Sequence, residues 1–170
     1  MKQGLLVGRF QPFHNGHLHA VKFALKKVDM LWIAIGSAQK SHEQKNPFTA
    51  GERLAMIKAT LDANKINPKK WLAVPVNDAN VHSLWVSQVD MLIPKYDVVF
   101  TNDPFSTMLF KEHGKKVMKI PFLKRKVLEG TAIRQQIAND ENWKAFVPMQ
   151  VTKIIEEIDG INRIKLLQSK

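Results

Sequence analysis

The residues best suited to chemistry lie in the segment Gly8–His17, which reads Gly-Arg-Phe-Gln-Pro-Phe-His-Asn-Gly-His. Its two imidazoles, His14 and His17, lie between an apolar run that predicts a short strand and a segment that predicts a helix. A helix N-terminus presents unpaired N–H groups and a partial positive charge, which favour a bound phosphate. Together with Arg9 the two imidazoles could hold a chain of phosphates, and Gly16 would let that chain approach the backbone.

The histidine pair admits two other interpretations. It could mark an ordinary solvated helix start, or its two rings could share a helical face and bind a divalent metal. The sequence has no His-Glu-x-x-His and no third ligand nearby, so a zinc site is disfavoured and no metal held by protein ligands alone is predicted. Walker A and Gly-x-Gly-x-x-Gly patterns are also absent, so any nucleotide must be bound in another way.

A second candidate phosphate site is the segment Gly130–Arg134. Thr131 is predicted at the start of a helix, with Arg134 one turn further on. A hydroxyl, free backbone N–H groups and a guanidinium at one helix N-terminus could bind phosphate. An ordinary Thr-capped helix with a surface arginine is the alternative.

The elements that must position these residues alternate along the chain. Apolar runs predict strands at 4–7, 31–35, 72–76, 97–101 and 116–120. Helical spacing predicts helices at 17–27, after the capping box 49–52, at 81–93, at 104–112, and beyond 130 with a break near Gly160. This order predicts an α/β fold, a Rossmann-like doubly wound parallel sheet of about five strands with a small helical C-terminal part. In such folds ligands bind beyond the carboxyl ends of the strands, where Gly8–His17 falls.

Length and composition fit one domain of 170 residues, which we expect to have a core at about 1–128 and a helical part at about 129–170. The chain has no cysteine, which excludes disulfides, thiolate metal sites and cysteine nucleophiles. No apolar run is long enough to span a bilayer and the N-terminus lacks signal-peptide features, so a cytoplasmic protein is expected. The net charge of +11 favours a polyanionic partner, and the densest basic run is Lys124-Arg125-Lys126.

The segment Gly8–His17 resembles the first signature of the nucleotidyltransferase superfamily with His-x-Gly-His, and in its longer form that of the archaeal-type nicotinamide mononucleotide (NMN) adenylyltransferases. Three further blocks resemble that family in the same order. They are 36–39 with 46–53, 74–78 with 84–86, and 130–134. The resemblance covers essentially the whole chain, and four motifs in order are far more specific than any one of them.

The resemblance implies transfer of AMP from ATP to NMN, giving NAD and pyrophosphate, with Mg2+ on the ATP phosphates. The residues expected to stabilise the transferring phosphates by charge and hydrogen bonds are His14, His17, Arg9 and Arg134. Those expected to bind ATP are Gly8, Phe10, Gly16, Gly130 and Thr131. The NMN phosphate is already largely ionised at neutral pH, so no general base is required.

Two residues are candidates for binding NMN. Trp85 could be simple core, but a flat indole also stacks on a cationic pyridinium ring, and the resemblance implies that second role. Asp78 is either a turn residue or a substrate contact. Thr49 and Glu52 are assigned to helix capping, and Arg53 to a solvated or ion-paired position.

The chain departs from its relatives' pattern at Glu129, where serine is common, at Lys45, where arginine occurs, and at Asn102–Asp103. The nearest rival function is another nucleotidyltransferase of this fold, with nicotinic acid mononucleotide, phosphopantetheine or FMN as acceptor. A basic nucleic-acid-binding module is a rival of another class, but no binding motif supports it. We expect neither nucleic acid nor membrane as partner, and the resemblance implies a homo-oligomer, a hexamer in archaeal relatives.

Overall fold

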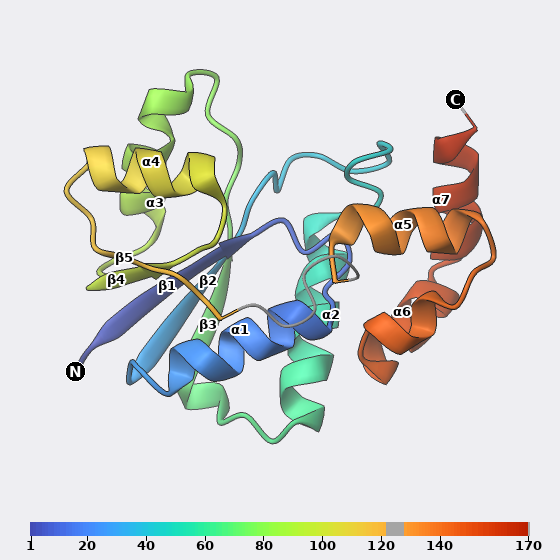
Figure 1. Ribbon diagram of the computed structural model, residues 1–170, viewed down its shortest axis with the longest axis horizontal. Helices are drawn as coiled ribbons and strands as arrows, with labels where there is room; N and C mark the ends of the chain where they lie inside the picture. Colours follow the sequence, from blue (N-terminus) through green and yellow to red (C-terminus); the bar gives the residue numbers. More distant parts are fainter. Residues whose placement is uncertain (122–127, 170) are drawn as a thin grey trace. The chain divides into compact units, whose positions relative to one another are not determined.

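The computed structural model describes residues 1–121 and 128–169, and one of its two compact units, the sheet unit of residues 1–8, 20–38 and 67–121, contains a parallel sheet (Figure 1). The five strands are β1 (Gln3–Gly8), β2 (Met30–Ile35), β3 (Trp71–Pro75), β4 (Val98–Phe100) and β5 (Val117–Met118). Their order is β3-β2-β1-β4-β5, and every pair is parallel. The predicted α/β fold is confirmed, and the order reverses direction between β1 and β4, which is the switch point of such sheets.

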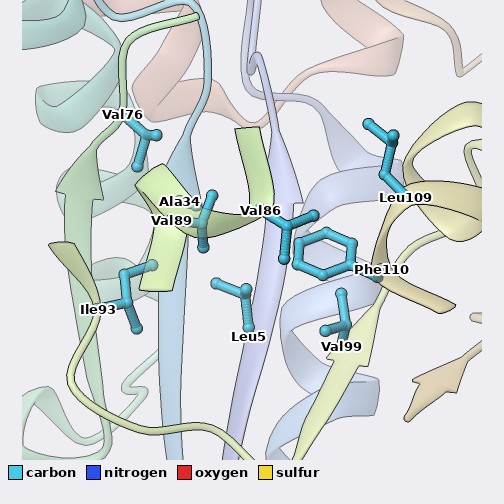
Figure 2. Close-up of a cluster of buried hydrophobic side chains, with 9 residues drawn as sticks. All are labelled: Leu5, Ala34, Val76, Val86, Val89, Ile93, Val99, Leu109 and Phe110. Carbon is cyan, nitrogen blue, oxygen red and sulfur yellow. The ribbon is translucent and has the colours of Figure 1, made fainter. Parts of the chain in front are cut away.

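Side chains on neighbouring strands alternate between two faces of the sheet, because successive residues of a strand point in opposite directions. On one face Leu5, paired in register with Val99, packs under α3 (Trp85–Leu92) and α4 (Pro104–Glu112). Figure 2 shows this cluster, formed by Leu5, Ala34, Val76, Val86, Val89, Ile93, Val99, Leu109 and Phe110. On the other face Phe23 of α1 (Asn15–Leu25) meets Phe100 edge-on, with ring centroids 6.2 Å apart. The sheet is therefore covered on both sides.

A second compact unit contains residues 9–19, 39–66 and the described part of 122–170. Its helices are α2 (Ala50–Ala63), α5 (Gly130–Ala138), α6 (Met149–Glu157) and α7 (Gly160–Gln168), with a 3-10 turn at Trp143–Phe146. Within this unit α2 packs against α6, and α7 packs against both α5 and α6. The predicted division at about 128 stays a prediction. No helix in the described part of the chain is long and apolar enough to cross a membrane.

Three predicted elements differ from the structure. The helix α1 begins at Asn15 rather than His17, because the carbonyl of His14 already accepts from His17 and Leu18. The segment 81–93 is divided into a 3-10 turn, His82–Leu84, and α3. The fifth strand is short because the Asn102 side chain takes both backbone groups of Ile120, at 2.8 and 2.9 Å. The run Lys124-Arg125-Lys126 lies outside the described residues.

Candidate active site

The two histidines that follow β1 form a stacked pair. The ring centroids of His14 and His17 are 3.6 Å apart and the rings are inclined by 23°. Phe10 and Phe13, both buried, support the His17 ring with centroid distances of 4.7 and 5.5 Å. The sequence placed Phe10 at the ATP site. The residue is 1% exposed, and its contact with ATP stays a prediction.

Backbone hydrogen bonds fix how each imidazole carries its proton. The Gly16 N–H donates to Nδ1 of His14 at 3.1 Å, and the His14 N–H donates to Nδ1 of His17 at 3.3 Å. A neutral ring whose Nδ1 accepts must carry its proton on Nε2. Each histidine therefore presents an Nε2–H donor, and the two stacked donors are the hydrogen-bonding part of a phosphate site.

Burial controls the charge of this pair. It lowers the pKa of His14 from 6.5 to about 4. The pKa of His17 is lowered well below its ordinary value by burial first and by the positive form of His14 second. Both rings are uncharged at neutral pH in the free protein. In the free protein the two rings are therefore uncharged hydrogen-bond donors, and permanent positive charge comes from arginine, while the charge of the rings with phosphate bound stays a prediction.

Arg134, at the start of α5, is one source of that charge. Its side chain is buried, with Nη1 donating to the carbonyl of Gln11 at 2.8 Å and Nη2 to Oγ1 of Thr131 at 3.2 Å. The alternative of a surface arginine on a Thr-capped helix is wrong, since the N-cap residue is Glu129. Burial, and then repulsion from Arg9, lowers the Arg134 pKa to about 10, so the guanidinium stays protonated at neutral pH.

Gly130 allows the close approach of these groups. A methyl group there would lie 3.1 Å from the Gln11 carbonyl oxygen and 3.2 Å from Nη1 of Arg134. Any larger side chain would separate the donor from its acceptor. Arg9 itself is exposed, and its repulsion of Arg134 indicates excess positive charge that a bound polyanion would neutralise.

Gln11 and Arg53 are positioning residues that the sequence did not identify. The Gln11 amide donates to the carbonyl of Phe48 at 2.8 Å and accepts from the Phe48 N–H at 2.9 Å. Arg53, expected in a solvated or ion-paired position, is fully buried and donates to the carbonyls of Arg9 at 2.9 Å and Thr49 at 3.1 Å. The solvated interpretation is wrong. Their partners are distant in sequence, so no local pattern reveals these roles.

The sheet unit holds another group of predicted site residues. Gly8 ends β1, and its carbonyl accepts from the Gly36 N–H at 2.9 Å. Just after β2, Ser37 adopts a left-handed backbone with φ of 49° and donates to Oδ1 of Asp78 at 2.9 Å. A non-glycine residue in that region costs roughly 1 kcal/mol, so the surrounding structure must hold it there. Asp78 therefore has a defined partner beyond the carboxyl end of β3, and contact with a substrate stays a prediction.

Trp85 begins α3 and is only partly buried. It packs against the cluster of Figure 2 and meets Phe110 edge-on, with centroids 5.6 Å apart. The core interpretation is thus confirmed for part of the side chain. Stacking on a pyridinium ring stays a prediction.

Asp103, one of the departures from the family pattern, has a structural role. Asp103 caps α4, with its carboxylate accepting from the Ser106 N–H at 2.7 Å. The Asp103 carboxylate therefore stabilises the start of α4. Within residues 1–121 and 128–169, no group of three or more histidine or acidic side chains is placed to hold a metal ion.

Comparison with known proteins adds to this geometry. The family model described as cytidylyltransferase-like matches residues 5–136. The chain is 44% identical to the nicotinamide-nucleotide adenylyltransferase of Pyrococcus furiosus, covering 98% of this chain and 89% of the relative. It is 48% identical to that of Thermoplasma acidophilum, covering 99% and 93%, and 47% identical to that of Archaeoglobus fulgidus, covering 96% and 95%.

A solved structure shares the fold. It is a bifunctional NMN adenylyltransferase/ADP ribose pyrophosphatase from Francisella tularensis, complexed with AMP and a manganese ion. The TM-score is 0.80 at 23% identity, over 98% of this chain and 51% of that one, so the chain spans about half of that protein.

Proposed function

Because the chain belongs to the cytidylyltransferase-like family and, within it, to the archaeal-type nicotinamide-nucleotide adenylyltransferases, we propose that it transfers AMP from ATP to NMN. The products are NAD and pyrophosphate. The observation that carries the proposal is the stacked pair His14 and His17, whose Nε2–H donors are fixed by backbone hydrogen bonds in one unit with the protonated Arg134. Two aligned neutral donors and a buried cation can hydrogen-bond the oxygens of a triphosphate and neutralise part of its charge.

In the proposed reaction an oxygen of the NMN 5′-phosphate attacks the α-phosphorus of ATP. The new P–O bond forms as the bond between the α-phosphorus and its bridging oxygen breaks, and pyrophosphate takes the electron pair. The nucleophile is already ionised, because its second pKa is about 6. No side chain has to remove its proton, and catalysis consists of alignment and stabilisation of charge.

The residues of the phosphate loop, Arg9–His17, share this work with Arg134. His14 and His17 donate hydrogen bonds to phosphate oxygens, while Arg134 and Arg9 neutralise the charge that grows toward pyrophosphate. The remaining ATP contacts in the proposal are the small residues and backbone groups of Gly8, Phe10, Gly16, Gly130 and Thr131. Mg2+ enters with ATP as part of the substrate, bound to its phosphate oxygens.

The acceptor half of the proposal rests on Trp85 and Asp78. The exposed part of the Trp85 indole would stack on the cationic nicotinamide ring, and the Asp78 carboxylate, held by Ser37, would contact the nucleotide. A homo-oligomer, expected to be a hexamer, and a cytoplasmic location remain predictions.

A single assay tests the proposal. Purified protein is given ATP and Mg2+ with NMN, nicotinic acid mononucleotide, phosphopantetheine or FMN in separate reactions, and pyrophosphate release is followed. Release with NMN, accompanied by NAD, is the expected result. Release with another acceptor alone would keep the adenylyl transfer and overturn the choice of NMN, and no release with any acceptor would overturn the proposed chemistry.

A further inference from the structure

The last helix, α7, holds the beginning of α2 through a two-pronged ion pair. Nη1 of Arg163 lies 2.7 Å from Oε2 of Glu52, and Nη2 lies 3.0 Å from Oε1. The same guanidinium donates to the carbonyls of Pro47 at 3.2 Å and Ile158 at 3.4 Å. Both charged side chains are 19% exposed. A partly desolvated, bidentate pair fixes geometry better than an exposed lysine pair can.

Glu52 is at the same time the capping residue of α2. Its Oε2 accepts from the Thr49 N–H at 2.8 Å, and its own N–H donates to Oγ1 of Thr49 at 3.1 Å. Burial by itself would raise the Glu52 pKa, but the hydrogen bonds from Arg163 and Thr49 outweigh it and hold the pKa below its ordinary value. The carboxylate that is ion-paired with Arg163 therefore determines the backbone geometry at the start of α2.

The segment that this cap fixes, Pro47–Arg53, also holds the phosphate loop. Phe48 makes two backbone hydrogen bonds with the Gln11 side chain, and Arg53 donates to the Arg9 carbonyl. The Gln11 carbonyl in turn accepts from Arg134. A continuous set of contacts thus runs from α7 to the groups that the proposed function places on ATP.

A second contact between α7 and this segment does not involve the ion pair. Phe48 is fully buried, and a methyl group on Gly160 would lie 3.0 Å from its Cε1 atom and 3.0 Å from the Ile155 carbonyl oxygen. The first residue of α7 is thus packed directly against the residue that Gln11 holds. Packing and the ion pair both fix the same segment.

We propose that Arg163 is a positioning residue for the ATP phosphate site, acting through Glu52 and the segment Pro47–Arg53 on Gln11 and Arg9. The inference rests on the proposed function and extends it, since none of the residues proposed to touch substrate lies on α7. Loss of the ion pair would let the segment shift. The arginine and histidine groups would then meet the phosphates in poorer alignment while the acceptor residues Trp85 and Asp78 were unaffected.

The test compares Arg163→Ala and Arg163→Lys with the control Lys165→Ala in the full-length protein. Lys165 lies on the same helix and makes an exposed ion pair with Asp140, 2.6 Å long, with side chains 37% and 74% exposed. Calorimetry measures the Kd for MgATP, and the NAD-forming assay gives kcat and the two KM values. We expect Arg163→Ala to raise the Kd and KM for ATP about tenfold, within the range of energetic coupling through contact networks.

In Arg163→Ala the KM for NMN should stay within about twofold of wild type. In Arg163→Lys the Kd for MgATP should lie between those of wild type and Arg163→Ala, because lysine keeps the charge but cannot make the bidentate contact. Lys165→Ala should behave as wild type. A purely structural role would lower the melting temperature and the active fraction, and hence kcat, without moving the Kd for MgATP. A folded Arg163→Ala protein with wild-type Kd would overturn the inference.

If Arg163→Ala does not fold, Gly160→Ala and Arg163→Lys carry the test, since the first disturbs the packing on Phe48 and keeps both side chains of the ion pair. An increase in the Kd for MgATP in both supports the inference, and wild-type values in both refute it. A wild-type protein that binds MgATP but forms no NAD would overturn the proposed function alone, because the Kd comparison does not depend on the acceptor.

Discussion

Gly16→Ala is expected to separate stability from catalysis. Gly16 is the second residue of α1, and a methyl group there would lie 3.0 Å from both Cε1 and Nδ1 of His14. Ordinary contacts of such a carbon are 3.4–4 Å, so the ring must move by a few tenths of an ångström. The ring cannot move freely, since His17 is stacked on it at 3.6 Å. The shift must weaken the stack or lengthen the bond from the Gly16 N–H to Nδ1, now 3.1 Å.

The two effects have different magnitudes. Alanine is favoured over glycine in a helix by up to about 1 kcal/mol, which offsets part of the steric cost, so the free energy of unfolding should change by no more than about 1 kcal/mol. That corresponds to a melting temperature within roughly 4 °C of wild type. Complete loss of an aligned donor lowers kcat by about 10²–10³-fold. A displaced ring should keep part of the donor's stabilising effect, so we expect kcat to fall roughly 10- to 100-fold.

Gly51→Ala is the matched control. Gly51 is likewise the second residue of its helix, α2, but a methyl group there meets only Oγ1 of Thr49, at 3.9 Å. Gly51→Ala should gain the same helix-propensity contribution to stability and keep the wild-type kcat. The assay is NAD formation at saturating ATP and NMN, with melting followed by circular dichroism. A Gly16→Ala enzyme with unchanged kcat would refute the assignment of the His14 ring to the phosphate site.

Three further outcomes are expected. Arg134→Lys keeps the charge but cannot reach both the Gln11 carbonyl and the Thr131 hydroxyl, so kcat should fall about 100-fold, as for one lost transition-state donor; steady-state kinetics that match wild type would contradict this. The lowered His14 pKa means that the unfolded chain takes up a proton below pH 6.5 before the native one does. The contribution of His14 to stability should therefore be complete above pH 6.5 and fall by about 3 kcal/mol toward pH 4, measured by urea unfolding, and His14→Asn should remove this part of the profile while leaving the part due to His17. Trp85→Ala should raise the KM for NMN about tenfold through the lost ring contact and leave the KM for ATP unchanged, whereas equal changes in both would indicate a core role only.

Local patterns accounted for much of the architecture. The alternation of apolar runs and helical spacing predicted the parallel sheet, because strand and helix periodicities are set by neighbouring residues. The helix Pro104–Glu112 was placed at its observed bounds, since proline begins it and Gly114 follows its end. The capping box of Thr49 and Glu52 is confirmed, because both partners lie within one turn of the chain.

The charge state of the site could not be predicted in the same way. From the sequence, His14 and His17 were assigned both charge and hydrogen bonds. In the free protein burial removes that charge, because desolvation disfavours an imidazolium, and burial is a property of the packed chain. The short fifth strand has a similar origin: the Asn102 side chain replaces backbone pairing at Ile120, 18 residues away.

By itself the sequence determined the order of elements, the position of the His-x-Gly-His segment after the first strand, and the family, all of which depend on short spacings. Only the tertiary structure decided how the phosphate loop is held. Gln11 binds Phe48 across 37 residues, Arg53 binds Arg9 across 44, and Arg163 binds Glu52 across 111. Such contacts have no period along the chain, because they join segments that meet only once the helices of the second unit have packed.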